Sequence, residues 1–232
     1  MRCPYIFALN ICRIYHIMED HQKVNVCENP MIYYIDNALT DEECEFIIEK
    51  AKPNMKIAGV SVMPGQTGYE KGVYQGRTNK SHWIPKEHYK EMNEICYRLA
   101  KIIDCECSFD WHPKFFESFQ VIHYEVGQEY KYHYDAYNVN DKAKYEKFCG
   151  ERGNRLKTIL VYLNDVEEGG DTGFDMARPL GEVIKIEPKK GRVVVFDNLK
   201  PDGTLNRRSR HAGLPVIKGE KWAFNLWLRE RE

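Results

Sequence analysis

The second half of this chain is a series of short segments with strand character. After about Phe115 the chain contains the runs ESFQVIHY, YKYHYD, KTILVYLN, GEVIKIEP, GRVVVFDN and KWAFNLWL, separated by Gly, Pro, Asn or Asp. Short antiparallel strands need their edges paired or covered, which sandwiches and jelly rolls achieve. The sequence therefore predicts an α+β protein whose core, at about 115–232, is a sandwich or jelly roll.

Two helices are expected before this core, over about 38–105. Thr40 and Glu43 form a capping box that predicts a helix ending before Pro53. A second helix is expected from Pro85, because apolar residues recur at helical spacing as far as Ile103. Both helices are predicted to pack on the outer face of one sheet.

Two polar segments interrupt these elements. Residues 59–80 are rich in glycine and predict a mobile hairpin or loop. Residues 136–155 predict a long polar insertion between strands, and long loops of this kind often act as lids. We expect both to fold over an extended ligand.

Composition limits the class of protein. The chain has 232 residues, of which 43% are hydrophobic and 30% charged, and this suits one domain at 30–232 with an arm at 1–29. The net charge of −1 gives no overall attraction to nucleic acid. The eight cysteines form no CxxC pair, so we expect reduced thiols. The oligomeric state cannot be read from the sequence.

The first residues are mildly apolar, but Asn10, Arg13 and His16 interrupt the run. It is too short to span a bilayer and lacks a clear cleavage site for a signal peptide. We expect no targeting function and slightly favour the cytoplasm. The alternatives are the endoplasmic reticulum lumen, if residues 1–18 act as a signal or anchor, and a true start at Met18.

A histidine and a carboxylate lie two residues apart in YKYHYD. Residues i and i+2 of a strand point to the same face, so His133 and Asp135 are expected to project together. The one histidine that follows them is His211. Two histidines and a carboxylate suit non-haem Fe(II) oxygen chemistry, although a zinc hydrolase uses the same residue types. A hydrogen-bonded pair without metal is the plain alternative.

A lysine in an apolar strand points to an anionic ligand. Lys221 follows His211 by ten residues, at the start of KWAFNLWL. A buried ammonium without an acidic partner is costly unless an anion joins it. An oxygenase that uses 2-oxoglutarate needs such a cation for the distal carboxylate of its cosubstrate. The alternative is a lysine at a strand end that faces water.

Four runs of the chain resemble, in order, the prolyl 4-hydroxylases of the collagen-modifying type. They are YEVGQEYKYHYD, RLKTILVYLNDVEEGGDTGF, PKKGRVVVFDN and RHAGLPVIKGEKWAFNLWLRE. The resemblance covers roughly residues 30–232 and is strong from Tyr124 onward. It implies an Fe(II)- and 2-oxoglutarate-dependent dioxygenase on a double-stranded β-helix, in a compact form with N-terminal helices packed on one sheet.

The resemblance also implies roles for single residues. The implied iron ligands are His133, Asp135 and His211. The residues implied to bind 2-oxoglutarate are Tyr124, Thr172 and Lys221, and those implied to line the peptidyl-proline pocket are Tyr130, Arg155 and Trp227. Arg229 stands where some members have a histidine, and Asp171 replaces the glutamate that is common in the GGET version of the motif.

The reaction that the resemblance implies is hydroxylation at C4 of prolyl residues in proline-rich or collagen-like peptides. The reaction would use Fe(II) as the cofactor and consume O2 and 2-oxoglutarate, with release of succinate and CO2. Ascorbate is a further implied cofactor. The implied partner is a proline-containing peptide or protein, with no nucleic acid and no stable membrane span. The alternatives are a sister oxygenase acting on a different amino-acid substrate and a non-catalytic binder of proline-rich peptides.

Overall fold

The computed structural model describes residues 22–61, 69–70, 73–74, 76–103, 113–176 and 183–232. Its largest element is an antiparallel sheet with the strand order β1-β2-β13-β9-β16-β7-β6-β3. The strands are β1 (Lys23–Glu28), β2 (Met31–Ile35), β13 (Val193–Asp197), β9 (Arg155–Tyr162), β16 (Lys221–Arg229), β7 (Phe119–Tyr124), β6 (Lys80–Ile84) and β3 (Lys56–Ile57).

A smaller sheet faces the large one. Its order is β12-β11-β14-β8, from β12 (Val183–Ile186), β11 (Thr172–Asp175), β14 (His211–Gly213) and β8 (Tyr130–His133). The short strands β10 (Glu168–Gly169) and β15 (Val216–Lys218) pair with each other. The predicted mixed fold rich in antiparallel sheet is confirmed.

The central strands of the large sheet are apolar on both faces. In β9, Ile159 and Val161 belong to one buried cluster, whereas Leu160 and Tyr162 belong to a second cluster. Alternate residues of a strand point to opposite faces, so each strand serves two cores. The second cluster includes Phe174 of the small sheet and therefore lies between the two sheets.

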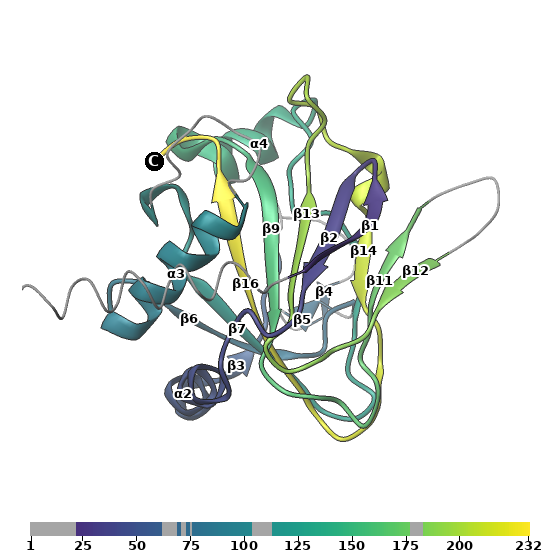
Figure 1. The fold of residues 1–232 in the computed structure, drawn as a ribbon. Coiled ribbons are helices and arrows are strands. Elements are labelled where there is room, and N and C mark those ends of the chain that lie inside the picture. Colours follow the sequence, from purple (N-terminus) through teal and green to yellow (C-terminus); the bar gives the residue numbers. More distant parts are fainter. Residues whose placement is uncertain (1–21, 62–68, 71–72, 75, 104–112, 177–182) are drawn as a thin grey trace, which may run out of the picture.

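Two helices cover the other face of the large sheet (Figure 1). Helix α2 (Asp41–Ala51) begins at the predicted capping box, in which Thr40 and Glu43 exchange hydrogen bonds, and ends just before the 3-10 turn η1 (Lys52–Asn54). Helix α3 is Lys90–Ile103. Ile47 of α2 and Leu99 of α3 are fully buried in the first cluster. The predicted packing of the helices on an outer sheet face is thus confirmed.

The second helix starts later than predicted. Pro85 opens a turn in which the His88 N–H donates to the Pro85 carbonyl, and α3 begins only at Lys90. The predicted helical region also holds the strands β3 and β6, which extend the large sheet at one edge. At the other edge, β1 pairs with β2, so residues assigned to the N-terminal arm join the sheet from Lys23.

The polar insertion at 136–155 is not a loop throughout. It contains helix α4 (Lys142–Cys149), whose N-cap Asp141 accepts a hydrogen bond from the Lys144 N–H, followed by the 3-10 turn η3 (Gly150–Arg152). The prediction was wrong because the segment is highly charged and buries little apolar surface, so periodicity gave a weak signal. Its lysine, alanine and glutamate residues are nonetheless good helix formers.

The glycine-rich segment at 59–80 is only partly described. Strands β4 (Tyr69–Glu70) and β5 (Val73–Tyr74) pair as the predicted hairpin, while residues 62–68, 71–72 and 75 lie outside the described residues. Two further 3-10 turns are η2 (Pro113–Phe115) and η4 (Arg207–Ser209).

The described cysteines are free thiols, namely Cys27, Cys44, Cys96 and Cys149. Burial raises the pKa of the Cys44 and Cys96 thiols to about 12, so both stay protonated at neutral pH.

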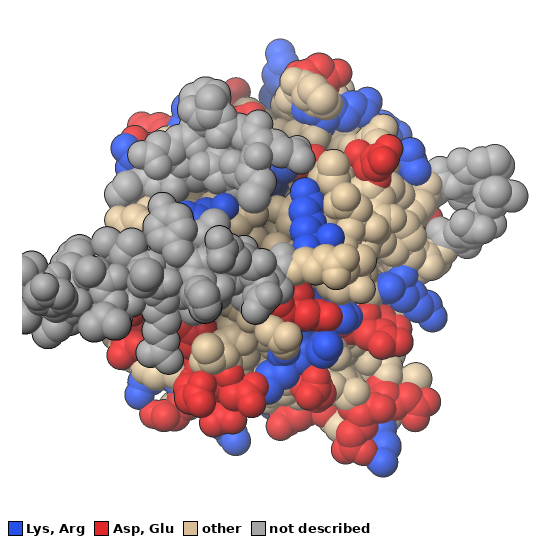
Figure 2. All heavy atoms as spheres, viewed as in Figure 1, with Lys and Arg blue, Asp and Glu red and all other residues tan. Residues whose placement is uncertain are grey.

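Among the described helices, none is long and apolar enough to cross a bilayer. On the face drawn in Figure 2, acidic and basic side chains are interspersed.

Candidate functional site

Three predicted ligands meet between the two sheets. His133 and His211 are register partners on the adjacent strands β8 and β14. Nε2 of His133 lies 3.6 Å from Oδ1 of Asp135, and Nε2 of His211 lies 3.6 Å from Oδ2. The three ligand atoms all lie within 4.8 Å of one another. One metal ion can therefore reach a nitrogen of each imidazole and an oxygen of the carboxylate.

Hydrogen bonds to the backbone orient both imidazoles. Nδ1 of His133 lies 2.8 Å from the carbonyl oxygen of Lys131, and Nδ1 of His211 lies 2.9 Å from that of Ser209. A carbonyl can only accept, so each Nδ1 carries the proton and each Nε2 keeps its lone pair. Burial lowers the pKa of His211 to about 4, which keeps this ring neutral at physiological pH. Two imidazole nitrogens and a carboxylate are a donor set that fits Fe(II).

The carboxylate of Asp135 is fixed by two donors. Thr158 Oγ1 and Trp227 Nε1 donate to Oδ2 over 2.7 and 3.0 Å. Asn198 Nδ2 in turn donates to Thr158 Oγ1 over 2.8 Å. Burial by itself would raise the pKa of Asp135, but His211 and His133 outweigh it and hold the pKa far below its usual range. The carboxylate is therefore ionised and rigidly placed.

Asp135 does not lie in a strand, contrary to the prediction. Strand β8 ends at His133, and Asp135 lies in the bend that follows, so alternation within a strand does not place it. Its position instead comes from Thr158 on β9 and Trp227 on β16, which draw the carboxylate toward the large sheet. The proximity of His133 and Asp135 is real, but its cause is tertiary.

Lys221 is buried inside the protein rather than turned to water. It is 2% exposed at the start of β16, and its ammonium donates to the Gly170 carbonyl over 2.6 Å. An ammonium has three N–H donors, and within the described part of the chain no carboxylate forms an ion pair with it. Burial lowers its pKa to about 7. A buried ammonium with unused donors fits the carboxylate of an anionic ligand.

The other residues expected near 2-oxoglutarate lie around this ammonium. Tyr124 faces Lys221 across the β7–β16 pair, and its ring centroid is 5.4 Å from Nζ. Burial raises the pKa of Tyr124 to about 12, so the phenol remains protonated. Thr172 accepts a hydrogen bond from the hydroxyl of Tyr162 over 2.7 Å. The ring of Tyr162 lies 5.2 Å from the Lys221 ammonium, so Tyr162 joins the predicted group.

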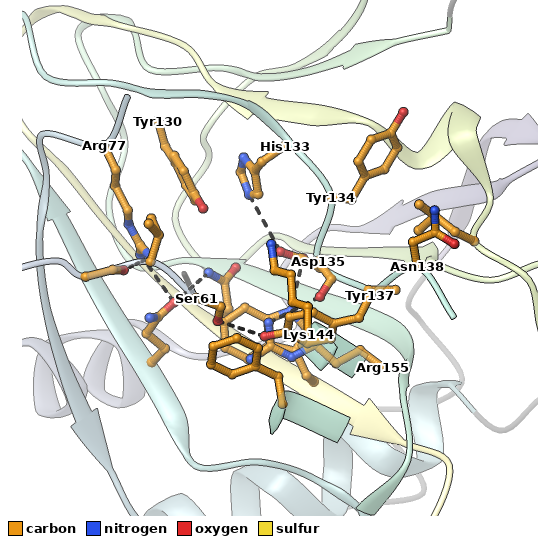
Figure 3. Close-up of a pocket in the computed structure, with 18 of the residues that line it drawn as sticks. Ser61, Arg77, Tyr130, His133, Tyr134, Asp135, Tyr137, Asn138, Lys144 and Arg155 are labelled. Carbon is orange, nitrogen blue, oxygen red and sulfur yellow. Dashed lines mark hydrogen bonds and ion pairs between the residues drawn. The ribbon is translucent and has the colours of Figure 1, made fainter. Parts of the chain in front are cut away.

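The predicted site residues line two adjoining cavities. The larger, of about 920 Å³, is lined by Tyr130, His133, Asp135, Arg155 and Trp227 (Figure 3). The smaller is lined by residues that include Tyr124, Tyr130, Thr172, His133, His211 and Lys221. His133 borders both cavities, so the candidate metal site separates an open pocket from an inner one.

The residues expected to contact a prolyl peptide all line the larger cavity. Arg155 Cζ lies 3.6 Å from the Trp227 ring, and Tyr130 stacks on His133 with centroids 3.6 Å apart. Arg155 also donates through Nε and Nη2 to both oxygens of the buried Glu117. Arg229 Nε lies 2.9 Å from the same carboxylate. Arg229 thus belongs to a buried ion cluster and does not line either cavity.

Several residues of the site were not predicted from the sequence. Thr158 and Tyr162 could have been found from alternation, because they share a face of β9 with Leu160, which packs between the sheets. No local pattern pointed to Glu117 or Asn198, whose contacts come from strands distant in sequence.

Comparisons with known proteins agree with this geometry. A family model described as the 2OG-Fe(II) oxygenase superfamily matches residues 119–229. Prolyl 4-hydroxylase 13 of Arabidopsis thaliana is 32% identical over 216 residues, covering 88% of this chain and 72% of that protein. Probable prolyl 4-hydroxylase 10 of the same organism is 36% identical over 211 residues, covering 84% and 68%. The chain belongs to the prolyl 4-hydroxylase family.

The fold is also similar to that of a solved prolyl hydroxylase structure. The viral collagen prolyl hydroxylase from Paramecium Bursaria Chlorella virus-1, in its 2OG complex, superposes with a TM-score of 0.64 at 29% identity. The match covers 88% of this chain and 98% of that chain. The chain is accordingly an Fe(II)- and 2-oxoglutarate-dependent dioxygenase, as the resemblance implied.

Proposed function

We propose that this enzyme hydroxylates C4 of prolyl residues in proline-rich or collagen-like peptides. The observation that carries the proposal is the convergence of His133, Asp135 and His211 at the mouth of an inner cavity that holds the Lys221 ammonium. Relatives named prolyl 4-hydroxylases support the choice of prolyl substrates. In this proposal the facing sheets are a double-stranded β-helix, the catalytic domain consists of residues 30–232 together with the edge strand β1, and ascorbate keeps the iron reduced.

The residues that line the two cavities have different roles in this proposal. His133, Asp135 and His211 would hold Fe(II), and Lys221 would pair with the distal carboxylate of 2-oxoglutarate beside Tyr124 and Thr172. When bound, iron and 2-oxoglutarate together supply the oxidising chemistry that inserts one oxygen atom of O2 into a C–H bond, with succinate and CO2 released. The protein contributes the fixed geometry and a site from which water is largely excluded.

The open cavity suits an extended peptide that passes over the metal site. Trp83 on β6 is 42% exposed, and its ring centroid is 5.7 Å from that of Trp227. The exposed ring of Trp83 offers a flat apolar surface to a pyrrolidine ring, and Tyr130 and Trp227 line the same cavity. A proline-rich peptide already favours the polyproline II conformation, so it loses little conformational entropy when it docks on aromatic surfaces.

The test is mass spectrometry of proline-containing peptides incubated with the enzyme, Fe(II), 2-oxoglutarate and ascorbate. We expect a gain of one oxygen atom on proline, and amino-acid analysis should identify 4-hydroxyproline. Succinate release without peptide oxidation would favour a sister oxygenase with a different amino-acid substrate. Peptide binding without succinate release would favour a non-catalytic binder.

A further inference from the structure

The segment that carries α4 is a fixed wall of the open cavity. Asn154 accepts a hydrogen bond from the Tyr137 N–H and donates one to the Tyr137 carbonyl, which closes the segment at its base. Arg229 donates to the carbonyls of Phe148 and Gly153 over 3.0 and 2.7 Å. Tyr137 and Phe148 stack with their ring centroids 5.3 Å apart. A side chain that α4 directs into the cavity is therefore presented from a rigid support.

One such side chain is Lys144. It is partly buried on α4, lines the open cavity, and extends toward the part of the cavity where His133 and Asp135 lie (Figure 3). Its backbone N–H donates to Asp141, but among the described residues no carboxylate lies within ion-pair distance of its ammonium. A cation held in a pocket without a partner is available to a charged ligand.

A second unneutralised cation lies in the same cavity. Arg77 is 5% exposed and donates to the oxygens of Asn79, Gly59 and Gln120, all of which are uncharged. The other charges of the lining are accounted for. Arg155 pairs with Glu117, which also faces Arg229, and Asp135 belongs to the candidate metal site. Asp141, the N-cap of α4, is the remaining carboxylate of the lining and balances only one of the two cations. The cavity thus carries an excess of positive charge on two of its sides.

We propose that Lys144 selects prolyl peptides with an acidic side chain, Asp or Glu, beside the target proline. The inference rests on the proposed function and specifies its substrate class. An acidic flanking residue would pair with the Lys144 ammonium in a cavity of reduced dielectric, while a basic one would be repelled by Lys144 and Arg77. Charge selection of this kind favours one peptide and disfavours another at the same position.

The experiment uses three proline-rich peptides that differ only in the residue next to the target proline, which is Glu, Gln or Lys. Mass spectrometry gives kcat/KM for each peptide at low and high salt. We expect the Glu peptide to exceed the Lys peptide by about tenfold at low salt, with a smaller ratio at high salt. Lys144→Glu should invert the order, and Lys144→Gln should bring the ratio close to one.

A matched control is Lys142→Glu, since Lys142 is an exposed lysine of α4 that does not line the cavity. This variant makes the same charge change and should keep the wild-type ratio. Equal kcat/KM for the three peptides, or a ratio that Lys144→Glu and Lys142→Glu alter equally, would overturn the role of Lys144 and leave prolyl hydroxylation standing. Hydroxylation of none of the peptides, under conditions in which succinate is released, would overturn the proposed function and this inference with it.

Discussion

Thr158 on β9 donates a hydrogen bond to Oδ2 of Asp135 over 2.7 Å, although the two residues are 23 positions apart in the chain. The same hydroxyl accepts a hydrogen bond from Asn198, so its single proton is directed at the carboxylate. Thr158 and Asn198 are 1% and 0% exposed, and water cannot replace either partner. The chain of donors from Asn198, which follows β13, through Thr158 on β9 fixes the orientation of the central candidate iron ligand.

Removing the Thr158 hydroxyl should weaken metal binding. In Thr158→Val the side-chain volume is nearly kept but Asp135 loses one of its two donors, and we expect the affinity for Fe(II), or for Co(II) as a spectroscopic probe, to fall by about 10- to 100-fold. Titration of the metal-free protein under anaerobic conditions measures this. Thr158→Ser keeps the donor and should stay close to wild type. Equal metal affinity in all three proteins would exclude the positioning role.

Removing the Lys221 ammonium should affect the cosubstrate rather than the metal. Lys221 lies in the inner cavity and is not one of the three clustered metal-ligating side chains. We expect Lys221→Ala to raise the KM for 2-oxoglutarate by at least about 100-fold, since a buried charge pair is lost, while Co(II) affinity stays near wild type. Normal 2-oxoglutarate decarboxylation in this variant would contradict the assignment.

The affinity for 2-oxoglutarate should depend on pH through the same residue. Burial lowers the pKa of Lys221 to about 7, so below pH 7 the ammonium is already charged in the free protein. Above pH 7 the protein must take up a proton when the anion binds, and the affinity should fall by up to about tenfold per pH unit. Calorimetric titration in the presence of Mn(II) measures this. Lys221→Arg is the control, because a guanidinium stays charged throughout and should give a flat profile.

The buried carboxylate of Glu117 should be essential for stability. It is 9% exposed and faces the guanidinium groups of both Arg155 and Arg229. Glu117→Gln leaves two buried cations without a counter-charge and should lower the free energy of unfolding by about 3–5 kcal/mol. Urea denaturation at pH 7 measures the loss. Glu49→Gln removes an exposed pair with Lys50 and should leave the midpoint of the urea transition close to that of the wild type.

The same carboxylate predicts an acid limit for the wild-type protein. Burial tends to raise the pKa of Glu117, but Arg155 and then Arg229 outweigh it, so the pKa in the folded protein is lower than the ordinary value of 4.5. The contribution of Glu117 is therefore complete above pH 4.5 and is lost as the pH falls through the lowered pKa. Denaturation curves between pH 3 and pH 7 should show this loss in the wild type and a weaker dependence in Glu117→Gln.

Local patterns predicted most of the elements, and long-range contacts decided the rest. The capping box of Thr40 and Glu43 and the alternation in β9 each lie within a few residues, and both appear in the structure as expected. The highly charged helix α4 was not predicted, because the hydrogen bonds that fix this segment come from residues outside the helix. Arg229 donates to the Phe148 carbonyl, and Asn154 donates to the Tyr137 carbonyl at the base of the segment. Asp135 was expected in a strand, but the bend that holds it depends on Thr158 and Trp227.

The sequence by itself determined the strand-rich second half, the helices before it, and the residue types of a site that binds iron and an anion. Hydrophobic periodicity, capping and residue spacing carry that information because each acts between near neighbours. Only the tertiary structure decided that His211 lies beside His133, that the Lys221 ammonium is buried, and that Lys144 faces the open cavity. These relationships depend on strand pairing and sheet packing, which join residues far apart in the chain and leave no local pattern.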